Sequence, residues 1–385
     1  MTSMTGRERL LKTFRREKPD RVPIGPFLWI NNVYEMFDYV PTIDNFLNPD
    51  DFDPYSKFVE YCDYFGFDVM HTLAYPYDAW DVDKPCENWD VKVSWEGAGD
   101  DRKKIIDIRT PEGDLRQTQN WRRSSKYMIV WATDEYLIKS KKDFDLLVKY
   151  GPPADQIDVS SITRARIATG DKGLVDSPNH GIFNTLALFR KLDDVMTDPM
   201  EDEGFYRAMM EFFTGYIEKQ MRKIVAAGAD IFEIGGNLAT SGVGPRFYKK
   251  FVFEYENRLI NAVREAGAFS LYHNCGDAAK IMHLYNDFDL DCWGYLTPPP
   301  YADVDLDEAL RVVRPDLVLR GNIDQVDFLV HASKDEIRAR VCDLLEKVKP
   351  RGNFILSTTD FFFDGCPYEN IKTFANAGKE FGLYE

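Results

Sequence analysis

Beyond about residue 200, amphipathic helical patterns alternate with short apolar runs along the chain. The clearest helical pattern covers 245–267, where apolar side chains recur at every fourth position: Phe247, Phe251, Tyr255, Leu259 and Val263. Further helices are expected at 277–286, 306–313, 337–348 and 369–379. The short runs between them are strand candidates, at 268–273, 292–296, 317–319 and 354–356. Such alternation predicts parallel strands joined by helices.

The N-terminal half continues this alternation. A helix is expected from Thr5, because Thr5 and Glu8 have the spacing of a capping box. A second helix should begin at Asp53-Pro54, an N-cap residue followed by the proline preferred in a first helical turn. Strands are expected at 21–23 and around 68–72. Such a series either opens into a doubly wound sheet or closes into a barrel. We favour an α/β fold of the (β/α)8 TIM-barrel type with an N-terminal helical extension.

The alternation is interrupted at about 84–135. A β-hairpin is predicted there, with strands at 103–108 and 115–121 and a Pro-Glu-Gly-Asp turn between them. Five of the seven tryptophans lie in or beside this excursion: Trp80, Trp89, Trp95, Trp121 and Trp131. They either form an aromatic lid over a pocket or only attach the excursion to the barrel. Because no linker or internal repeat is visible, residues 1–385 are expected to form a single domain.

Composition and charge narrow the class of protein. Hydrophobic residues make up 44% of the 385 residues, which is enough for a packed core. The net charge of -16 has the wrong sign for binding nucleic acid or an anionic membrane surface. The longest apolar run, 127–132, is about a third of the ~18 residues that a membrane-spanning helix needs. No signal-peptide pattern is present, so a cytoplasmic protein with reduced thiols is expected.

Four residues are candidates for a metal site. The chain has no phosphate-loop, dinucleotide-binding or H-E-x-x-H motif to suggest other chemistry. His273 and Cys275 follow an apolar run in the sequence His-Asn-Cys-Gly, where a turn after a strand lets both side chains face one ion. Cys366 also follows a predicted strand, and in a parallel barrel such loops gather on one face. Glu233 lies inside an apolar strand, where an unpaired carboxylate needs a cation or hydrogen bonds.

These candidates also have purely structural interpretations. Taken alone, His273 and Cys275 are better explained as a hydrogen-bonded histidine beside a buried thiol. The Glu233 carboxylate is equally compatible with capping by the backbone amides of Gly235-Gly236. If the four residues do bind one ion, thiolate and imidazole donors favour zinc over magnesium or calcium.

Six segments carry a resemblance to a known family: 7–9 (Arg-Glu-Arg), 18–23 (Lys-Pro-Asp-Arg-Val-Pro), 233–242, 273–277, 321–324 (Gly-Asn-Ile-Asp) and 366–371. Together they resemble the uroporphyrinogen decarboxylase superfamily, and within it the zinc-containing, cobalamin-dependent methyltransferases. The resemblance spans nearly the whole chain and implies a (β/α)8 barrel. It also implies zinc bound by His273, Cys275 and Cys366, to which we add Glu233 as a further ligand.

The resemblance further implies methyl transfer between a small-molecule methyl donor or acceptor and a corrinoid (cobalamin) cofactor. The chain lacks the Asp-x-His-x-x-Gly motif of corrinoid carriers, so the corrinoid is expected on a partner carrier protein. Trp29 and the aromatic excursion favour a methoxylated aromatic donor, with O-demethylation as the first half-reaction. The candidate substrate-binding residues are Trp29, His71, His180 and Asn322, with a structural role as the alternative for the two histidines.

Other functions remain open on the sequence. The chain lacks the Arg-Gln-Ala-Gly-Arg stretch that uroporphyrinogen decarboxylases carry after the position of Pro23. Their pyrrole-binding aspartate falls near Tyr75 here, which also argues against porphyrinogen decarboxylation. The alternatives are a metal-free decarboxylase or lyase of the same superfamily, and a non-catalytic barrel that binds a small molecule. A monomer and a homodimer are both compatible with the sequence.

Overall fold

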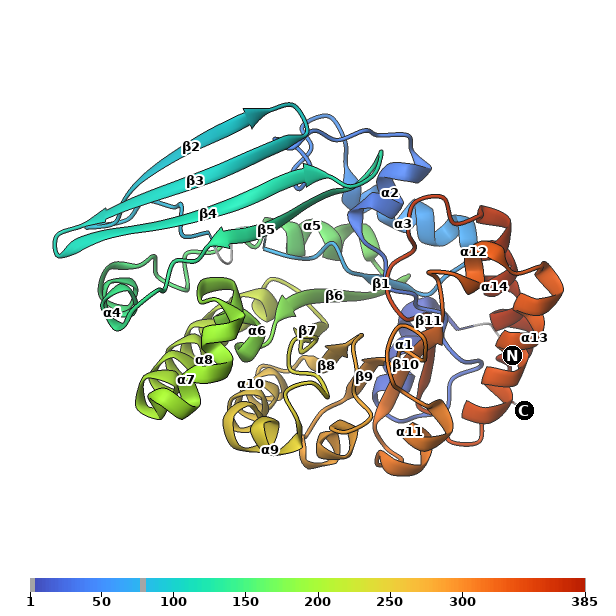
Figure 1. The fold of residues 1–385 in the computed structure, drawn as a ribbon. Coiled ribbons are helices and arrows are strands. Elements are labelled where there is room, and N and C mark those ends of the chain that lie inside the picture. The colour runs from blue at the N-terminus through green and yellow to red at the C-terminus, as the bar shows by residue number, and fades with distance from the viewer. Residues whose placement is uncertain (1–3, 77–80, 385) are drawn as a thin grey trace.

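The computed structural model describes residues 4–76 and 81–384. Within these residues, seven parallel strands form one curled sheet in the order β1-β6-β7-β8-β9-β10-β11 (Figure 1). Their bounds are Val69–His71 (β1), Gly173–His180 (β6), Ile231–Gly235 (β7), Phe269–Asn274 (β8), Cys292–Tyr295 (β9), Val318–Ile323 (β10) and Phe354–Thr358 (β11). The expected α/β barrel fold is therefore confirmed.

The segment 21–25 closes the barrel between its two outermost strands. Ile24 bridges Leu356 of β11 in parallel. On its other side, the Ile24 carbonyl accepts a hydrogen bond of 2.8 Å from the backbone N–H of Asp68, directly before β1. The strand expected at 21–23 is thus present as a short extended segment, and its pairing is brief because Pro23 has no backbone N–H to donate.

Helices surround the strands on the outside of the barrel (Figure 1). Their bounds are Gly6–Phe14 (α1), Ile30–Met36 (α2), Pro54–Phe65 (α3), Lys141–Tyr150 (α4), Ser160–Thr169 (α5), Ile182–Phe189 (α6), Leu192–Glu201 (α7), Glu203–Ala226 (α8), Pro245–Phe247 (α9), Phe253–Glu265 (α10), Leu306–Val312 (α11), Phe328–His331 (α12), Lys334–Val348 (α13) and Tyr368–Phe381 (α14). A short 3-10 helix covers Met282–Asp287. Over residues 4–76 and 81–384, no helix has the length and apolar character to cross a membrane.

Local sequence signals explain where several helices begin and end. At the start of α1, the Thr5 hydroxyl accepts from the Glu8 N–H and the Glu8 carboxylate accepts from the Thr5 N–H, as the capping box predicts. Helix α3 follows the N-cap Asp53 and ends at Gly66, which has a φ of 75°. The helix expected over 245–267 is interrupted, because a π-helical turn at Tyr248–Val252 separates α9 from α10.

The excursion forms a separate antiparallel sheet of four strands rather than one hairpin. These strands are Asp90–Ala98 (β2), Asp101–Thr110 (β3), Gly113–Arg123 (β4) and Ile129–Glu135 (β5), paired in chain order. The predicted hairpin corresponds to β3 and β4, and the outer strands extend it on both sides. This antiparallel sheet lies across the top of the barrel in Figure 1. Trp80 of the tryptophan group lies outside the described residues.

The barrel interior begins with an apolar layer. Each parallel strand contributes one side chain, and α1 contributes two: Met70, Leu174, Ile231, Leu271, Cys292, Val318 and Ile355 from the strands, with Leu10 and Phe14 from α1. Every one of these side chains is buried. Helix α1 therefore seals the amino-terminal end of the barrel, and the carboxyl-terminal end faces the antiparallel sheet.

Candidate metal centre

A polar layer lies directly above the apolar layer. Successive residues of a strand point to opposite faces, so a residue two positions further along also points into the barrel. Two positions beyond members of the apolar layer stand Asp176 on β6, Glu233 on β7, His273 on β8 and Arg320 on β10. The side chains of Asp176, Glu233 and Arg320 are buried, and that of His273 is 15% exposed. The strand periodicity thus places four ionisable groups inside the barrel.

Arg320 is the cation of this polar layer. Its Nη1 lies 3.1 Å from Asp176 Oδ2 and 3.8 Å from Glu233 Oε2. Its Nε donates to the Gly25 carbonyl at 3.0 Å, and the guanidinium lies 4.7 Å from the centre of the Tyr295 ring. Burial, together with the charge of Glu233, raises the pKa of Asp176 well above its usual value. The single charge of this buried arginine thus faces Glu233 and an Asp176 carboxyl group that favours its protonated form.

Glu233 holds the His273 ring. Its Oε1 lies 2.5 Å from His273 Nδ1, and its Oε2 accepts a hydrogen bond of 3.2 Å from the Tyr295 hydroxyl. Burial alone would raise the pKa of Glu233, but the charge and hydrogen bond of His273 lower it. For His273 the two effects have the opposite sign. Burial alone would lower its pKa, but the negative charge of Glu233 raises it well above its usual value. With Nδ1 engaged by Glu233, Nε2 is the ring nitrogen that remains for a metal.

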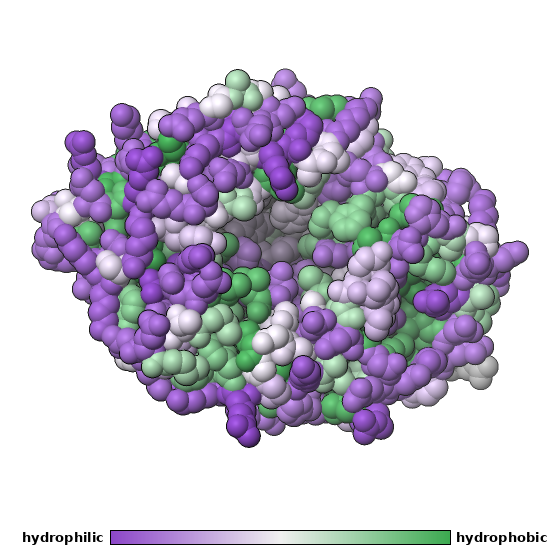
Figure 2. Space-filling view, viewed as in Figure 1, coloured by the Kyte–Doolittle hydropathy of each residue, from purple (hydrophilic) through white to green (hydrophobic). Residues whose placement is uncertain are grey.

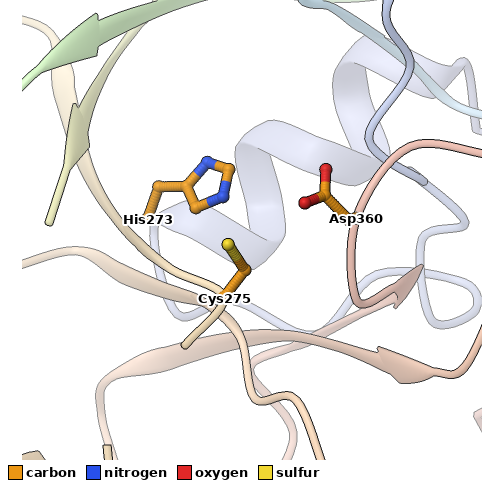
Figure 3. Close-up of side chains that lie close together, drawn as sticks. All are labelled: His273, Cys275 and Asp360. Atoms are coloured by element: carbon orange, nitrogen blue, oxygen red, sulfur yellow. The ribbon is translucent and has the colours of Figure 1, made fainter. Parts of the chain in front are cut away.

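The structure brings His273 together with Cys275 and Asp360. One potential ligand atom from each of these side chains lies within 4.8 Å of the other two. Figure 3 shows the three side chains pointing toward a common centre. His273 lies near the end of β8, Cys275 directly follows that strand, and Asp360 follows β11. The group therefore offers one nitrogen, one sulfur and one oxygen donor at the carboxyl-terminal end of the barrel.

Buried amides hold the turn that carries Asp360. The Gln325 side-chain oxygen accepts hydrogen bonds from the Thr359 N–H at 3.1 Å and from the Asp360 N–H at 3.3 Å. Two residues further on, the Phe362 carbonyl accepts a hydrogen bond of 2.5 Å from the Asn32 side chain. Gln325 and Asn32 are both 1% exposed. The loop that carries Asp360 is thus fixed at two points, because Gln325, just after β10, binds the Asp360 N–H and Asn32 of α2 binds the Phe362 carbonyl.

Cys366 is not part of this group in the part of the chain that the structure describes. It is 3% exposed, and its Sγ lies 4.0 Å from the Leu329 carbonyl. Burial, with the nearby charge of Glu35, raises the pKa of the Cys366 thiol to about 12. Glu233 is also outside the group of three and contacts the opposite side of the His273 ring. The sequence reasoning missed Asp360, which stands two residues after β11, because other aspartates of this chain also follow strands.

A pocket of about 590 Å³ lies between the antiparallel sheet and the barrel. Figure 2 shows the corresponding hollow in the middle of this face of the molecule. Of the predicted substrate-binding residues, Trp29 and His180 line the pocket, as do Glu233 and His273. Burial lowers the pKa of His180 to about 4, and the charge of His273 adds to this effect. His180 is therefore a neutral ring beside the candidate metal centre.

The structure places His71 and Asn322 outside this pocket. His71 is fully buried; its Nε2–H donates to the Tyr55 carbonyl at 3.1 Å, and its ring stacks on Phe58 with centres 4.2 Å apart. Asn322 lines a separate groove beside α11 and α13, and its side-chain amide lies 3.4 Å from the Leu296 carbonyl. Both residues therefore have structural partners away from the space that a substrate would occupy.

Comparison with known proteins identifies the family. The model of the family described as "Uroporphyrinogen decarboxylase (URO-D)" matches residues 181–381, which is more than half of the chain. A uroporphyrinogen decarboxylase of Gloeobacter violaceus is 24% identical over 170 residues, or 43% of this chain and 46% of that protein. A methylcobamide:CoM methyltransferase (MtbA) of Methanosarcina mazei is 22% identical over 180 residues, or 46% of this chain and 50% of that protein. The chain thus spans about half the length of these curated relatives.

A solved structure supports the same fold over the whole chain. The structure of a "methyltransferase from Methanosarcina mazei" superposes with a TM-score of 0.69 at 16% sequence identity. The superposition covers 98% of this chain and 99% of that one. The two chains therefore share their overall architecture.

Proposed function

This chain belongs to the uroporphyrinogen decarboxylase family, and on that premise we propose that it is a zinc-dependent methyltransferase. It moves a methyl group between a small molecule and a corrinoid carried by a separate protein. The observation that carries the proposal is the group of His273, Cys275 and Asp360 at the open end of the barrel. The similarity to a methylcobamide:CoM methyltransferase supports the same activity.

The chemistry of the three donors fits zinc. Catalytic zinc sites have three protein ligands drawn from imidazole, thiolate and carboxylate groups, with a position left for substrate. Magnesium and calcium prefer sites made of oxygen ligands alone, which the Cys275 sulfur does not match. Metal-binding histidines also commonly donate their second ring N–H to a carboxylate, as His273 does to Glu233. In the proposed ligand set, Asp360 takes the place first assigned to Cys366.

The side chains next to the three proposed ligands hold them in position. When bound, zinc supplies a Lewis acid that stabilises negative charge on an oxygen or sulfur of the small molecule. Glu233 holds a proton at His273 Nδ1, so that Nε2, which points toward Cys275 and Asp360, would give up its own proton on binding the metal. Tyr295 and Arg320 fix the Glu233 carboxylate in turn. The antiparallel sheet covers the pocket and limits its contact with bulk water.

O-demethylation of a methyl ether is the direction we propose, with the corrinoid as methyl acceptor. The chain contains no Asp-x-His-x-x-Gly carrier motif, so the corrinoid arrives on a partner protein. The hollow in Figure 2 gives access from solvent to the pocket beside His273. The carrier would approach at this opening, because the apolar layer and α1 seal the opposite end of the barrel.

Metal analysis of purified protein tests the ligand set. We expect about one zinc per chain in the wild type. Replacing a ligand should remove it, so Cys275→Ser and Asp360→Asn should lose most of the zinc while circular dichroism shows an intact fold. Cys366→Ser is the matched control and should keep its zinc. Loss of zinc from Cys366→Ser but not from Asp360→Asn would refute the set, and a wild type without zinc would refute the proposal.

Activity is tested separately with a cobalt(I) corrinoid carrier and methyl ethers. Formation of methyl-cobalt, followed by its absorption spectrum, is expected with the wild type and with Cys366→Ser. The rate should fall at least a hundredfold in Cys275→Ser, because the Lewis acid contributes several kcal/mol and about 1.4 kcal/mol is tenfold in rate. The absence of methyl-cobalt with ethers, alcohols, amines and thiols alike would contradict the assignment.

Decarboxylation is the second candidate, because several matched relatives are uroporphyrinogen decarboxylases. Such an activity would need no metal at His273, Cys275 and Asp360. The test is release of carbon dioxide from uroporphyrinogen by protein that has been treated with a chelator. Release at an unchanged rate, together with an absence of methyl transfer, would favour the decarboxylase.

A further inference from the structure

The antiparallel sheet turns one face toward the pocket. Lys104 on β3 pairs with Gln119 on β4, and Gln119 pairs in turn with Thr133 on β5. Two residues further along β4, Trp121 pairs with Trp131 of β5. All five of these side chains line the pocket opposite the carboxyl-terminal ends of the barrel strands. The antiparallel sheet therefore supplies one wall of the same space that contains His273.

Gln117 is the unusual member of this wall. It precedes Gln119 by two positions on β4, so both side chains face the pocket. Gln117 is only 5% exposed, and among residues 4–76 and 81–384 neither its side-chain oxygen nor its side-chain nitrogen is found in a hydrogen bond. Its amide atoms are not among the fully enclosed polar atoms that lack a partner, so they reach the space inside the pocket. The amide thus lies ready to bind a polar group of a ligand.

The charged residues of the pocket already have partners. Lys104 Nζ lies 2.7 Å from Asp83 Oδ2, and both side chains are largely buried. Asp81 is also engaged in an interaction. On the barrel side, Glu233 is bonded to His273 and Tyr295. Among the described residues of this wall, no charged side chain is left without a partner, so a ligand group on this side of the pocket would find no counter-ion if it were charged.

Aromatic side chains on both sides of the pocket favour a flat ligand. Trp121 stacks on Trp131 with ring centres 4.6 Å apart and planes 10° from parallel. The Trp121 indole N–H donates to the Gln119 side-chain oxygen at 3.1 Å, which fixes the ring. From the barrel side, Phe27 stacks with Trp29 and meets the edge of the His273 ring, 5.5 Å between centres. Flat aromatic surfaces on both walls favour a planar ligand.

From these observations we propose that the small molecule is an uncharged methoxyphenol, whose ring packs between these aromatic walls and whose hydroxyl group hydrogen bonds to Gln117. Gln117 is then a specificity-determining residue. The inference rests on the proposed function, because it identifies the substrate class of that methyltransferase. It also makes a separate claim about binding, which needs neither zinc nor corrinoid.

Calorimetric titration with three probes tests the claim on the wild type. The probes are ortho-methoxyphenol, methoxybenzene, which lacks the hydroxyl group, and para-methoxybenzoate, which carries a charge. We expect ortho-methoxyphenol to bind about five- to tenfold more tightly than methoxybenzene, which is the usual effect of one hydrogen bond. The benzoate should bind at least tenfold more weakly than the phenol. Equal or tighter binding of the benzoate overturns the proposal.

The variant Gln117→Met removes the amide and keeps nearly the same side-chain length. In this variant, ortho-methoxyphenol should bind no more tightly than methoxybenzene, whose own affinity should stay within twofold of the wild-type value. Gln156→Met is the matched control, because Gln156 is exposed on the loop between α4 and α5, and it should leave all affinities unchanged. An equal loss for both ligands in Gln117→Met overturns the assignment.

The outcomes separate this inference from the proposed function. The same titrations in Cys275→Ser should show the same ranking of the probes, because Gln117 is independent of the metal ligands. If the ranking holds while no methyl-cobalt forms, the binding inference stands and the methyltransferase fails. If methyl-cobalt forms from the benzoate as fast as from the phenol, the binding inference fails. Should Gln117→Met not fold, the wild-type ranking of the probes decides.

Discussion

At the scale of single residues, the Glu233 carboxylate decides how His273 is used. A histidine ring has two nitrogens, and a carboxylate at one of them determines which is free to bind a metal. Glu233 lies 2.5 Å from Nδ1, and its other oxygen is held by the Tyr295 hydroxyl. The free nitrogen therefore faces Cys275 and Asp360. A glutamine at position 233 would keep the shape of the Glu233 side chain. It would lack the negative charge that attracts the His273 ring.

We therefore predict that Glu233→Gln binds zinc about 10- to 100-fold more weakly than the wild type. The expected cause is a less basic and less firmly oriented His273 ring. Competition between the protein and a zinc chelator measures the affinity. Glu308→Gln on the exposed side of α11 is the control and should not change it. Unchanged zinc affinity in Glu233→Gln would show that Glu233 does not orient the ligand.

His273 and Cys275 could be predicted from sequence because they stand at the end of an apolar strand, where the chain turns. Asp360 could not, because aspartates after strands are common in this chain, as Asp277 and Asp324 show. A preference for thiolate ligands pointed to Cys366 instead. That cysteine lies six positions further, where the chain packs into the core at the start of α14. Only the three-dimensional course of this loop separates the two candidates.

At the scale of elements, helix α6 begins on a buried carboxylate. The Phe183 N–H in its first turn donates to Glu256 Oε1 of α10 at 3.2 Å, and the second oxygen of Glu256 has no partner among the described residues. Burial raises the pKa of Glu256 to about 8. In the unfolded chain the same group ionises near its ordinary pKa of 4.5. Between these two values the folded state holds a proton that the unfolded state releases.

Stability should therefore fall as the pH rises from about 4.5 to about 8, by about 1.4 kcal/mol per pH unit from this residue. Glu256→Gln is neutral at every pH and lacks this contribution. Between about pH 6 and pH 8, its free energy of unfolding should gain about 2–3 kcal/mol relative to the wild type. Urea unfolding at both pH values measures the difference. A difference between the two proteins that does not change with pH would contradict the assignment.

The elements with a strong periodic pattern could be predicted, and the weaker ones could not. Strands β3 and β4 carry enough alternating apolar residues to be seen in the sequence. Strand β2 is exposed over most of its length, so it has no buried face to leave a pattern. The π-helical turn at Tyr248–Val252 keeps the apolar stripe of its helix continuous, which hides the interruption from any argument based on spacing.

At the scale of the whole molecule, the apolar side chains that stabilise the barrel lie in a different layer from the side chains of the candidate metal centre. The apolar layer and α1 fill the amino-terminal end, and the polar layer with the candidate metal centre lies above them. Phe14 of α1 is fully buried and stacks on Phe269 of β8, with ring centres 4.9 Å apart. Removing this ring should leave a cavity at the sealed end of the barrel.

We predict that Phe14→Ala lowers the free energy of unfolding by about 3–5 kcal/mol, the usual effect of deleting a buried aromatic ring. Urea unfolding measures this loss. The folded fraction should keep its zinc, because the cavity lies below the polar layer. Ile167→Ala is the control at a position that is 77% exposed, and it should change stability by less than about 0.5 kcal/mol. A loss of zinc from folded Phe14→Ala would show that the two layers are not separate.

Asp364 connects the antiparallel sheet to the loop that carries Asp360. Its carboxylate accepts hydrogen bonds from the Ser125 hydroxyl and the Tyr127 N–H, both in the turn between β4 and β5, and from the Asn31 amide of α2 at 3.0 Å. The antiparallel sheet and the loop of Asp360 are therefore both attached through Asp364. Asp364 lies four residues from Asp360, so a displacement of the antiparallel sheet at this corner would also shift the loop that holds the candidate ligand.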